Sequence, residues 1–273
     1  AVSYLERIFE TIDEPVEVKD AKDAIEMPAI QGKLEFEHVT FSYEKGVEIL
    51  KDVNFSVEPG KTIAFVGPTG AGKSTIVNLI SRFYNVDSGR ILIDGVDISK
   101  VTLRSLRKQM GVMMQDSFIF GGTIMDNIRY GNKTATDEEV IRAAKTVCAH
   151  DFIMQMEDGY QTQVNERGSR LSVGQRQLIS FARALLADPA ILILDEATSS
   201  IDTETEIVLQ EGLNHLLKGR TSFIIAHRLS TIQNADCIMY ISDGGIAEAG
   251  THEELLQKHG KYYELYEAQY KSV

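Results

Sequence analysis

A glycine-rich stretch carries the strongest chemical signal in this chain: residues 67–74 read GPTGAGKS and match the pattern GxxxxGK[ST]. In such a loop the glycines let successive backbone N–H groups turn toward phosphate oxygens, and the helix that follows adds its positive end. Lys73 would supply a point charge to the outer phosphates, and Ser74 would offer a hydroxyl to Mg²⁺. The pattern requires a strand before the loop and a helix after it, and the sequence provides both. We therefore predict a phosphate-binding site here.

Two adjacent carboxylates stand at the end of another apolar strand. Residues 191–194 are Ile-Leu-Ile-Leu, and Asp195 and Glu196 follow directly. A carboxylate at the C-terminal end of a parallel strand faces the crevice in which α/β proteins bind ligands, so Asp195 is placed to hold a metal ion through water. Glu196 would polarise an attacking water as a general base. The competing interpretation is an acidic first turn of a helix, and the phosphate loop favours the catalytic one.

A third stretch, residues 171–177 with the sequence LSVGQRQ, leads into an amphipathic helix. Ser172 and Gln175 have the spacing of a capping box, in which each side chain bonds the backbone N–H of the other residue and the helix begins. The alternative is a second anion site, made of exposed N–H groups, the serine hydroxyl and the helix dipole. Spacing alone leaves both interpretations open.

These stretches need a scaffold of strands and helices to position them. Apolar and polar residues alternate over residues 34–39, and a second strand pattern covers residues 49–57. Continuous apolar runs, typical of parallel strands covered on both faces, occupy residues 62–66, 191–194, 222–226 and 237–241. The helix after the loop presents one apolar face made of Ile76, Leu79, Ile80 and Phe83. Helical patterns dominate a predicted insertion at about residues 117–187 and the end of the chain, residues 251–270, so we predict an α/β fold.

The charge balance excludes one broad class of function. The 273 residues carry 28 Lys and Arg against 40 Asp and Glu, a formal charge of −12 with a calculated pI near 5.0. A nucleic-acid binder needs clustered basic surface, so we predict no nucleic-acid partner. Cys148 and Cys237 are too few for a disulfide framework and show no zinc-ligand spacing, which favours a reducing compartment. No apolar run approaches the roughly 18 to 20 residues that cross a bilayer, and we expect the isolated chain to be soluble.

The first 32 residues differ from the rest of the chain. Residues 3–12 have the pattern of a short amphipathic helix that Pro15 ends. Residues 13–26 hold six acidic residues and two lysines, a net charge of −4 that is typical of a solvated linker. The chain begins with Ala1 and has no secretory leader, which suggests an excised fragment. We predict a helix and linker at residues 1–32 and a separate domain at residues 33–273.

Together, these stretches resemble the nucleotide-binding domain of an exporter-type ATP-binding cassette (ABC) transporter, over about residues 33–266. The resemblance rests on an ordered set of motifs: Tyr43 as the aromatic that stacks on adenine, residues 67–75 as Walker A, Gln115 as the Q-loop, residues 171–175 as the signature, Asp195 and Glu196 as Walker B with its base, residues 199–202 as the D-loop, and His227 as the switch histidine. Residues 162–168 are similar to a segment that exporters use at the domain interface. Val173 replaces the first signature glycine, and Asn165 replaces the usual glycine of that segment.

The resemblance implies a fold, an activity and partners. The fold is a P-loop NTPase with a RecA-like parallel sheet core, an N-terminal antiparallel β-subdomain and an inserted helical subdomain. The activity is ATP hydrolysis with Mg²⁺ that drives export, carried out by a head-to-tail dimer around two ATP·Mg²⁺. The partners are a second cassette, in a homodimer or a heterodimer, and the transmembrane domain of the same transporter, at the cytoplasmic face of the membrane. Residues 1–32 would then be a remnant of that membrane domain.

The resemblance also implies a role for each matching residue. Catalysis falls to Lys73, Glu196 and His227. The nucleotide is held by Tyr43, Gly67, Thr69, Gly70, Ala71, Gly72, Lys73, Ser74, Thr75 and Gln115. The ligands of Mg²⁺ are Ser74, Gln115 and Asp195. The signature and D-loop contacts to the partner's nucleotide come from Ser172, Gly174, Gln175 and Asp202.

Plainer interpretations compete with several of these roles. Tyr43 could be a strand aromatic packed on the β-subdomain, Gln115 a polar residue at a strand end, and His227 a satisfied histidine at a strand terminus. The remaining histidines are expected at the surface without a ligand role: His38, His150, His215, His252 and His259. The C-terminal tyrosines are expected to form a helix packing face: Tyr262, Tyr263, Tyr266 and Tyr270. Two other functions, a soluble cassette ATPase acting on nucleic acid or ribosomes and a non-hydrolysing nucleotide sensor, are disfavoured by the acidic charge and by Glu196.

Overall fold

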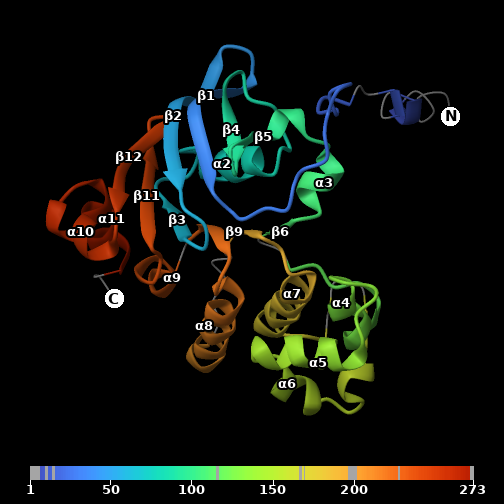
Figure 1. Ribbon diagram of the computed structural model, residues 1–273. Coiled ribbons are helices and arrows are strands. Elements are labelled where there is room, and N and C mark those ends of the chain that lie inside the picture. The colour runs from blue at the N-terminus through green and yellow to red at the C-terminus, as the bar shows by residue number, and fades with distance from the viewer. Residues whose placement is uncertain are drawn as a thin grey trace.

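The computed structural model describes residues 7–9, 12–13, 16–114, 117–165, 168, 170–195, 202–226 and 228–270. In Figure 1 the strands gather in the upper part of the molecule, and helices α4 to α7 (within residues 124–187) form a separate group below them. The first described residues and the C-terminal helices lie on opposite sides of the molecule. These helices, α10 (His252–Lys258) and α11 (Lys261–Tyr270), both contact β12 (Gly245–Gly250).

A six-stranded sheet forms the core, in the order β12-β11-β3-β10-β9-β6. Its strands are β3 (Thr62–Val66), β6 (Met110–Met113), β9 (Ile191–Asp195), β10 (Thr221–Ile225), β11 (Cys237–Ser242) and β12 (Gly245–Gly250). All neighbouring pairs are parallel except β11 with β12. The central strands β3, β10 and β9 are buried almost throughout, as strands covered on both faces must be. The predicted parallel α/β core is therefore confirmed.

A four-stranded antiparallel sheet covers one face of this core. Its order is β2-β1-β4-β5, built from β1 (Leu34–Glu44), β2 (Val47–Val57), β4 (Ser88–Ile93) and β5 (Val96–Asp97). Helix α2 (Lys73–Ile80) belongs to one apolar cluster with both sheets, in which Phe65 stacks on Phe223 with ring centroids 6.1 Å apart. The predicted antiparallel β-subdomain is thus confirmed, and both of its first strands are longer than their sequence patterns indicated.

A group of helices shares an apolar cluster with the opposite face of the core sheet. They are α4 (Ile124–Arg129), α5 (Asp137–Thr146), α6 (His150–Met154), α7 (Val173–Ala187) and α8 (Thr203–Leu217). Alternation along β3 separates the two faces: Ile63 and Phe65 join the α2 cluster, whereas Ala64 and Val66 join the cluster of these helices. A short pair, β7 (Gly122–Thr123) and β8 (Gln163–Val164), lies beside α4. The predicted helices between β6 and β9 are present, and the limits of a helical subdomain at 117–187 stay a prediction.

Two details of the predicted helices were wrong. Phe83 lies beyond the end of α2 and is 42% exposed, because Ser81 caps the helix and Arg82 turns to a positive φ of 50°. The terminal helical pattern is two helices, α10 (His252–Lys258) and α11 (Lys261–Tyr270), because His259 adopts the left-handed conformation with φ 50°. The structure also describes two shorter helices, α3 (Leu103–Arg107) and α9 (Leu229–Gln233), and two 3-10 helices, Ile98–Lys100 and Gly159–Gln161.

Two of the histidines expected at the surface are half-buried. His150 Nδ1 lies 2.9 Å from the Tyr160 hydroxyl, and His252 Nδ1 lies 2.7 Å from the Tyr262 hydroxyl. Each pair joins a helix to the segment that follows it, so these histidines pack the fold. Tyr262 is only 1% exposed, which confirms that the terminal tyrosine face includes a packing residue.

The predicted linker is exposed over most of its described residues but follows the domain surface. The Leu103 N–H donates to the Asp20 carboxylate over 2.8 Å, and the Ile25 N–H donates to the Lys100 carbonyl over 3.0 Å. Met27 and Ile30 are then buried in the α2 cluster. The linker is thus anchored from Asp20 onward. Within the described ranges, no helix combines the length and the apolarity that crossing a membrane requires.

Candidate functional site

The glycine-rich loop connects β3 to α2 at the C-terminal edge of the core sheet. Gly67 has φ 135°, and a Cβ atom there would collide with the carbonyl oxygen of Ile241 on the neighbouring strand β11. Gly72 caps α2 with φ 106°, and a Cβ atom there would press on Leu50. Both positions therefore require glycine, and the loop conformation that the sequence predicts is built into the packing around it.

Lys73, the first residue of α2, is folded back over this loop. Its Nζ donates to the carbonyl oxygens of Gly67 over 2.7 Å and Pro68 over 2.8 Å, and only 9% of the residue is exposed. Burial lowers the pKa of Lys73 below its ordinary value, and the negative charge of Asp195 acts in the opposite direction. A buried cation held by neutral carbonyls at the mouth of a loop is suited to an anionic ligand.

The residues around Lys73 are accessible to a ligand. Thr69, Gly70 and Ser74 are exposed, and Ala71 is partly exposed. Ser74 lies in the first turn of α2, where its hydroxyl is available to a cation. Thr75 is buried and accepts a hydrogen bond from the hydroxyl of Tyr43 over 3.2 Å.

Tyr43 stands on β1 beside the loop. Its ring meets those of Phe41 and Tyr84 edge to face, with centroids 4.8 and 5.0 Å away, and 47% of the residue is exposed. The strand-aromatic interpretation therefore describes real contacts. These contacts are also compatible with stacking on adenine. The edge contacts and the hydrogen bond to Thr75 hold the ring next to the phosphate loop, and part of the ring stays exposed.

Asp195 ends β9 at the same edge of the sheet. In the strand register Ile225 of β10 pairs with Asp195 on one side and with Phe65 of β3 on the other, two residues before Gly67. The carboxylate is thus one strand away from the loop. Together with the Ser74 hydroxyl it supplies the oxygen ligands that Mg²⁺ prefers, so these residues fit the ion. Gln115, Glu196 and His227 lie outside the described residues, so their predicted roles stay predictions.

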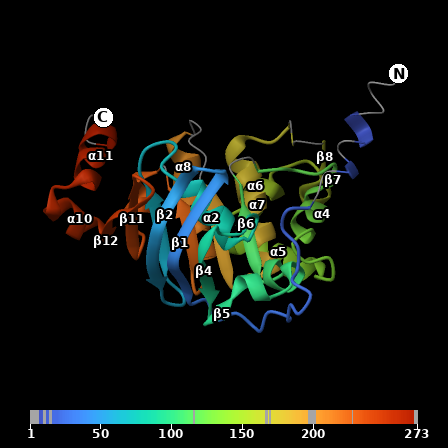
Figure 2. The same ribbon diagram turned by 90° about the horizontal axis from the view of Figure 1, so that it is seen from above.

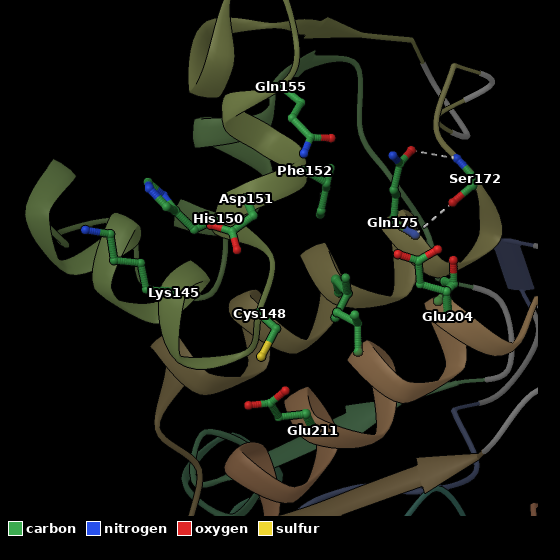
Figure 3. A pocket seen from close by; sticks show the side chains of 13 residues that line it. Lys145, Cys148, His150, Asp151, Phe152, Gln155, Ser172, Gln175, Glu204 and Glu211 are labelled. Carbon is green, nitrogen blue, oxygen red and sulfur yellow. Dashed lines mark hydrogen bonds between the residues drawn. The ribbon is translucent and has the colours of Figure 1, made fainter.

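The signature stretch forms the capping box that its spacing predicts. The Gln175 N–H donates to Ser172 Oγ over 3.1 Å, and the Ser172 N–H donates to Gln175 Oε1 over 3.0 Å, as Figure 3 shows. Ser172 and Val173 are exposed at the start of α7, and Gly174 is buried. The capping box occupies the Gln175 amide, while the first amides of a helix have no carbonyl one turn earlier to bond. A second anion site at this end remains a prediction.

A groove lies between α5 and α6 on one side and α7 and α8 on the other. It measures about 850 Å³ and has Ser172 and Gln175 at one end (Figure 3). Asp202, the predicted D-loop residue, caps α8 nearby and accepts from the Thr205 N–H over 2.9 Å. Among the described residues, none of the phosphate loop lines this groove.

Sequence reasoning missed an aromatic surface that follows Gln115 in the chain. Phe118, Phe120 and Tyr130 are 50%, 37% and 53% exposed, and Phe120 contacts both other rings with centroids 5.0 and 4.5 Å away. The guanidinium of Arg183 on α7 lies 5.3 Å from the Phe120 centroid and 5.8 Å from that of Tyr130. The pair of phenylalanines two residues apart was the available signal. We call Phe118, Phe120 and Tyr130 the aromatic patch.

The phosphate loop between a parallel strand and a helix, its buried lysine, and a carboxylate one strand away define a P-loop nucleoside-triphosphate-binding domain. Figure 2 shows the antiparallel β1, β2 and β4 between the C-terminal helices α10 and α11 on one side and the helices α4 and α5 on the other. The profile of the ABC transporter family matches residues 50–199. The chain belongs to the ABC transporter family.

Individual relatives agree with this membership. The chain is 54% identical over 270 residues, 99% of its length and 45% of the relative, to "Uncharacterized ABC transporter ATP-binding protein YfiC" of Bacillus subtilis. It is 50% identical, over 97% of its length and 42% of the relative, to "Fatty acid ABC transporter ATP-binding/permease protein" of Mycobacterium bovis. The chain therefore spans less than half the length of these relatives.

A solved structure is also similar. It is described as "Structure of a bacterial Atm1-family ABC exporter with ATP bound", and the alignment has a TM-score of 0.89 and 42% sequence identity over 98% of this chain and 47% of the other. The predicted ABC ATPase fold is confirmed by this similarity together with the sheet order.

Proposed function

We propose that this chain is the ATP-hydrolysing motor domain of an ABC exporter. The observation that carries the proposal is the arrangement at the edge of the sheet. Buried Lys73 covers the glycine loop there, and the negative charge of Asp195 on β9 favours the charged form of this lysine. A cation and a line of backbone amides there would bind the β and γ phosphates of ATP and stabilise the charge that develops during phosphoryl transfer. The similar ATP-bound exporter supports this assignment.

We assign the catalytic roles from the order of these residues in the sequence. Ser74, Gln115 and Asp195 would hold Mg²⁺, which neutralises phosphate charge when bound. Glu196 directly follows Asp195 in the chain and would accept a proton from the attacking water. His227 follows β10 in the chain, and β10 lies between β3 and β9 in the sheet. His227 would contact the γ-phosphate. Tyr43 would stack on the base.

The second half of the site would come from another cassette. Ser172 and Val173 are exposed at the start of α7, where helix N–H groups and the helix dipole favour a phosphate. In a head-to-tail dimer, Ser172, Gly174, Gln175 and Asp202 of one chain would face the nucleotide bound by Lys73 of the other. ATP would then favour the closed dimer and hydrolysis would release it.

The aromatic patch is a candidate contact for the transmembrane domain. A group of neighbouring exposed aromatic rings on a protein surface often marks a site that binds a partner. The aromatic patch begins shortly after Gln115 in the chain, and the predicted role of Gln115 is to contact the Mg²⁺ of the nucleotide. A partner bound to the patch would therefore contact a segment that is close in sequence to this residue of the proposed nucleotide site. The permease named in the mycobacterial relative supports a membrane partner. We infer that residues 33–273 work at the cytoplasmic face of a membrane and that residues 1–32 lead to the membrane domain.

Replacement of Glu196 by glutamine tests the proposed hydrolysis. Phosphate release from the purified domain with Mg·ATP should fall by about 10² to 10⁴, because a general base contributes that factor, while ATP binding measured by calorimetry should persist. Glu138→Gln, at an exposed position in the first turn of α5, is the matched control and should hydrolyse like the wild type. Hydrolysis by the Glu196 variant at the wild-type rate would refute the assigned base. No hydrolysis by the wild type would refute the motor function.

A further inference from the structure

Gly174, the second residue of α7, is packed against the start of α8. A Cβ atom at this position would overlap the Cγ2 methyl of Thr205, well inside van der Waals contact. The next atoms are at ordinary distances, 3.5 Å for Leu209 Cδ1 and 3.8 Å for Thr205 Cβ. Unlike Gly67 and Gly72, Gly174 does not have a positive φ, so its own backbone would accept alanine. The obstacle to a side chain at residue 174 is therefore one methyl group.

Thr205 also contacts the residue that begins α8. Its N–H donates to the Asp202 carboxylate over 2.9 Å, and this backbone N–H together with the Thr205 side chain lowers the pKa of that carboxyl below its ordinary value. One side of Thr205 therefore holds Asp202, and the other side meets Gly174. Figure 3 shows the adjacent Glu204 beside the Ser172–Gln175 capping box. The start of α7 thus meets the start of α8 at Gly174 and the half-buried Thr205.

We propose that Thr205 is a positioning residue that fixes the signature stretch, residues 172–175, relative to Asp202, and that its methyl group is the reason residue 174 is glycine. This inference rests on the proposed function, in which both segments face the nucleotide of a partner chain. The glycine is then required by packing within one chain. Alanine at 174 would push the starts of α7 and α8 apart and misplace both contacts together.

The close packing of α7 against α8 explains why residue 174 is glycine, although helix propensity favours alanine at this position. Glycine inside a helix is less favourable than alanine because it loses more backbone freedom on folding. Removal of the Thr205 methyl should therefore convert the alanine substitution from harmful to tolerated. The Thr205→Ser substitution removes only this methyl group and keeps the hydroxyl.

The test compares Gly174→Ala, Thr205→Ser and the double variant in the full 273-residue chain. The readouts are the midpoint of thermal unfolding without nucleotide, and kcat and KM for Mg·ATP hydrolysis. Gly174→Ala should lower the midpoint and reduce kcat by about tenfold or more, since small displacements of contacting groups have effects of that size. The double variant should match Thr205→Ser in kcat and melt no lower than it.

A control and the contrary results make the test decisive. Thr203→Ser, at an exposed position in the first turn of α8, should leave the Gly174→Ala defect unchanged. A double variant that regains its melting midpoint but keeps the low kcat would show that the nucleotide requires the glycine, and would overturn the positioning role. So would a double variant as unstable as Gly174→Ala. If the wild type failed to hydrolyse ATP, the proposed function would be wrong. The midpoint of thermal unfolding of the double variant would still test the contact between Gly174 and Thr205.

Discussion

The hydroxyl of Tyr43 on β1 lies 3.2 Å from Oγ1 of Thr75 in the first turn of α2. This bond joins the antiparallel sheet to the helix that carries the phosphate loop, and it fixes the ring beside the loop. The proposed nucleotide site is therefore assembled from two sheets: the proposed adenine contact lies on β1, and the proposed phosphate loop follows β3.

Replacement of Tyr43 by alanine should weaken ATP binding by about 5- to 150-fold, because stacking of a base on an aromatic ring contributes about 1 to 3 kcal/mol. Tyr43→Phe keeps the ring and loses only the bond to Thr75, so its dissociation constant should stay within about threefold of the wild type. Calorimetric titration with ATP measures both. Equal weakening by the two variants would assign the effect to the hydroxyl and contradict stacking.

Lys73→Met should abolish measurable ATP binding and leave the fold intact. Methionine replaces the buried stem, and the two carbonyls that Lys73 bonds belong to an exposed loop that water can reach. We expect the free energy of unfolding without nucleotide to change by about 1 kcal/mol or less, because lost hydrogen bonds and relieved burial of a charge oppose each other. Urea unfolding and titration with ATP check the two halves. Retained ATP affinity in a folded variant would exclude the assigned phosphate contact.

Arg183 should be more important for stability than an ordinary surface arginine. Its guanidinium donates to the Phe118 and Asn127 carbonyls over 3.0 and 2.9 Å and to the Asn127 side chain over 3.1 Å, beneath the aromatic patch. Arg183→Met should destabilise the fold by about 2 to 4 kcal/mol, because both acceptors on the buried Asn127 lose the guanidinium. Arg142→Met, on the exposed side of α5, should change stability by about 0.5 kcal/mol or less. Urea unfolding compares them, and equal effects would contradict the anchoring role.

Alkaline unfolding should depend on Tyr160. Burial raises the pKa of Tyr160 to about 12 from 10.0. The folded state therefore holds this proton more tightly than the unfolded state, so the contribution is complete below pH 10 and is lost as the pH rises toward 12. The loss would be at most about 3 kcal/mol. Tyr160→Phe should flatten the fall of unfolding free energy across that window, and an unchanged slope would show that this group does not titrate as described.

Features that depend on local pattern could be predicted from the sequence. The apolar runs indicated β3 and β9 because strands buried on both faces have no polar positions, and the capping box at Ser172 followed from two residues three apart. The helix end before Phe83 and the break at His259 depended on single residues adopting a positive φ, which periodicity does not reveal.

Contacts between distant segments could not be predicted in this way. Arg183 meets Phe118 and Asn127, and Gly174 meets Thr205, only after α7 packs between α4 and α8. In the sequence Gly174 is just one of the signature residues, and nothing near it indicates which atom excludes a side chain. The fold supplies that reason.

Assembly of the composite site is tested most directly by light scattering of Glu196→Gln with Mg·ATP, combined with a count of bound nucleotides. The account predicts a dimer that holds two nucleotides, and a monomer without ATP. Adding Ser172→Arg should prevent dimer formation, whereas Thr136→Arg, which removes a comparable helix cap from α5, should not. A Glu196→Gln protein that binds ATP yet stays monomeric, or a dimer indifferent to Ser172→Arg, would contradict a site shared between two chains.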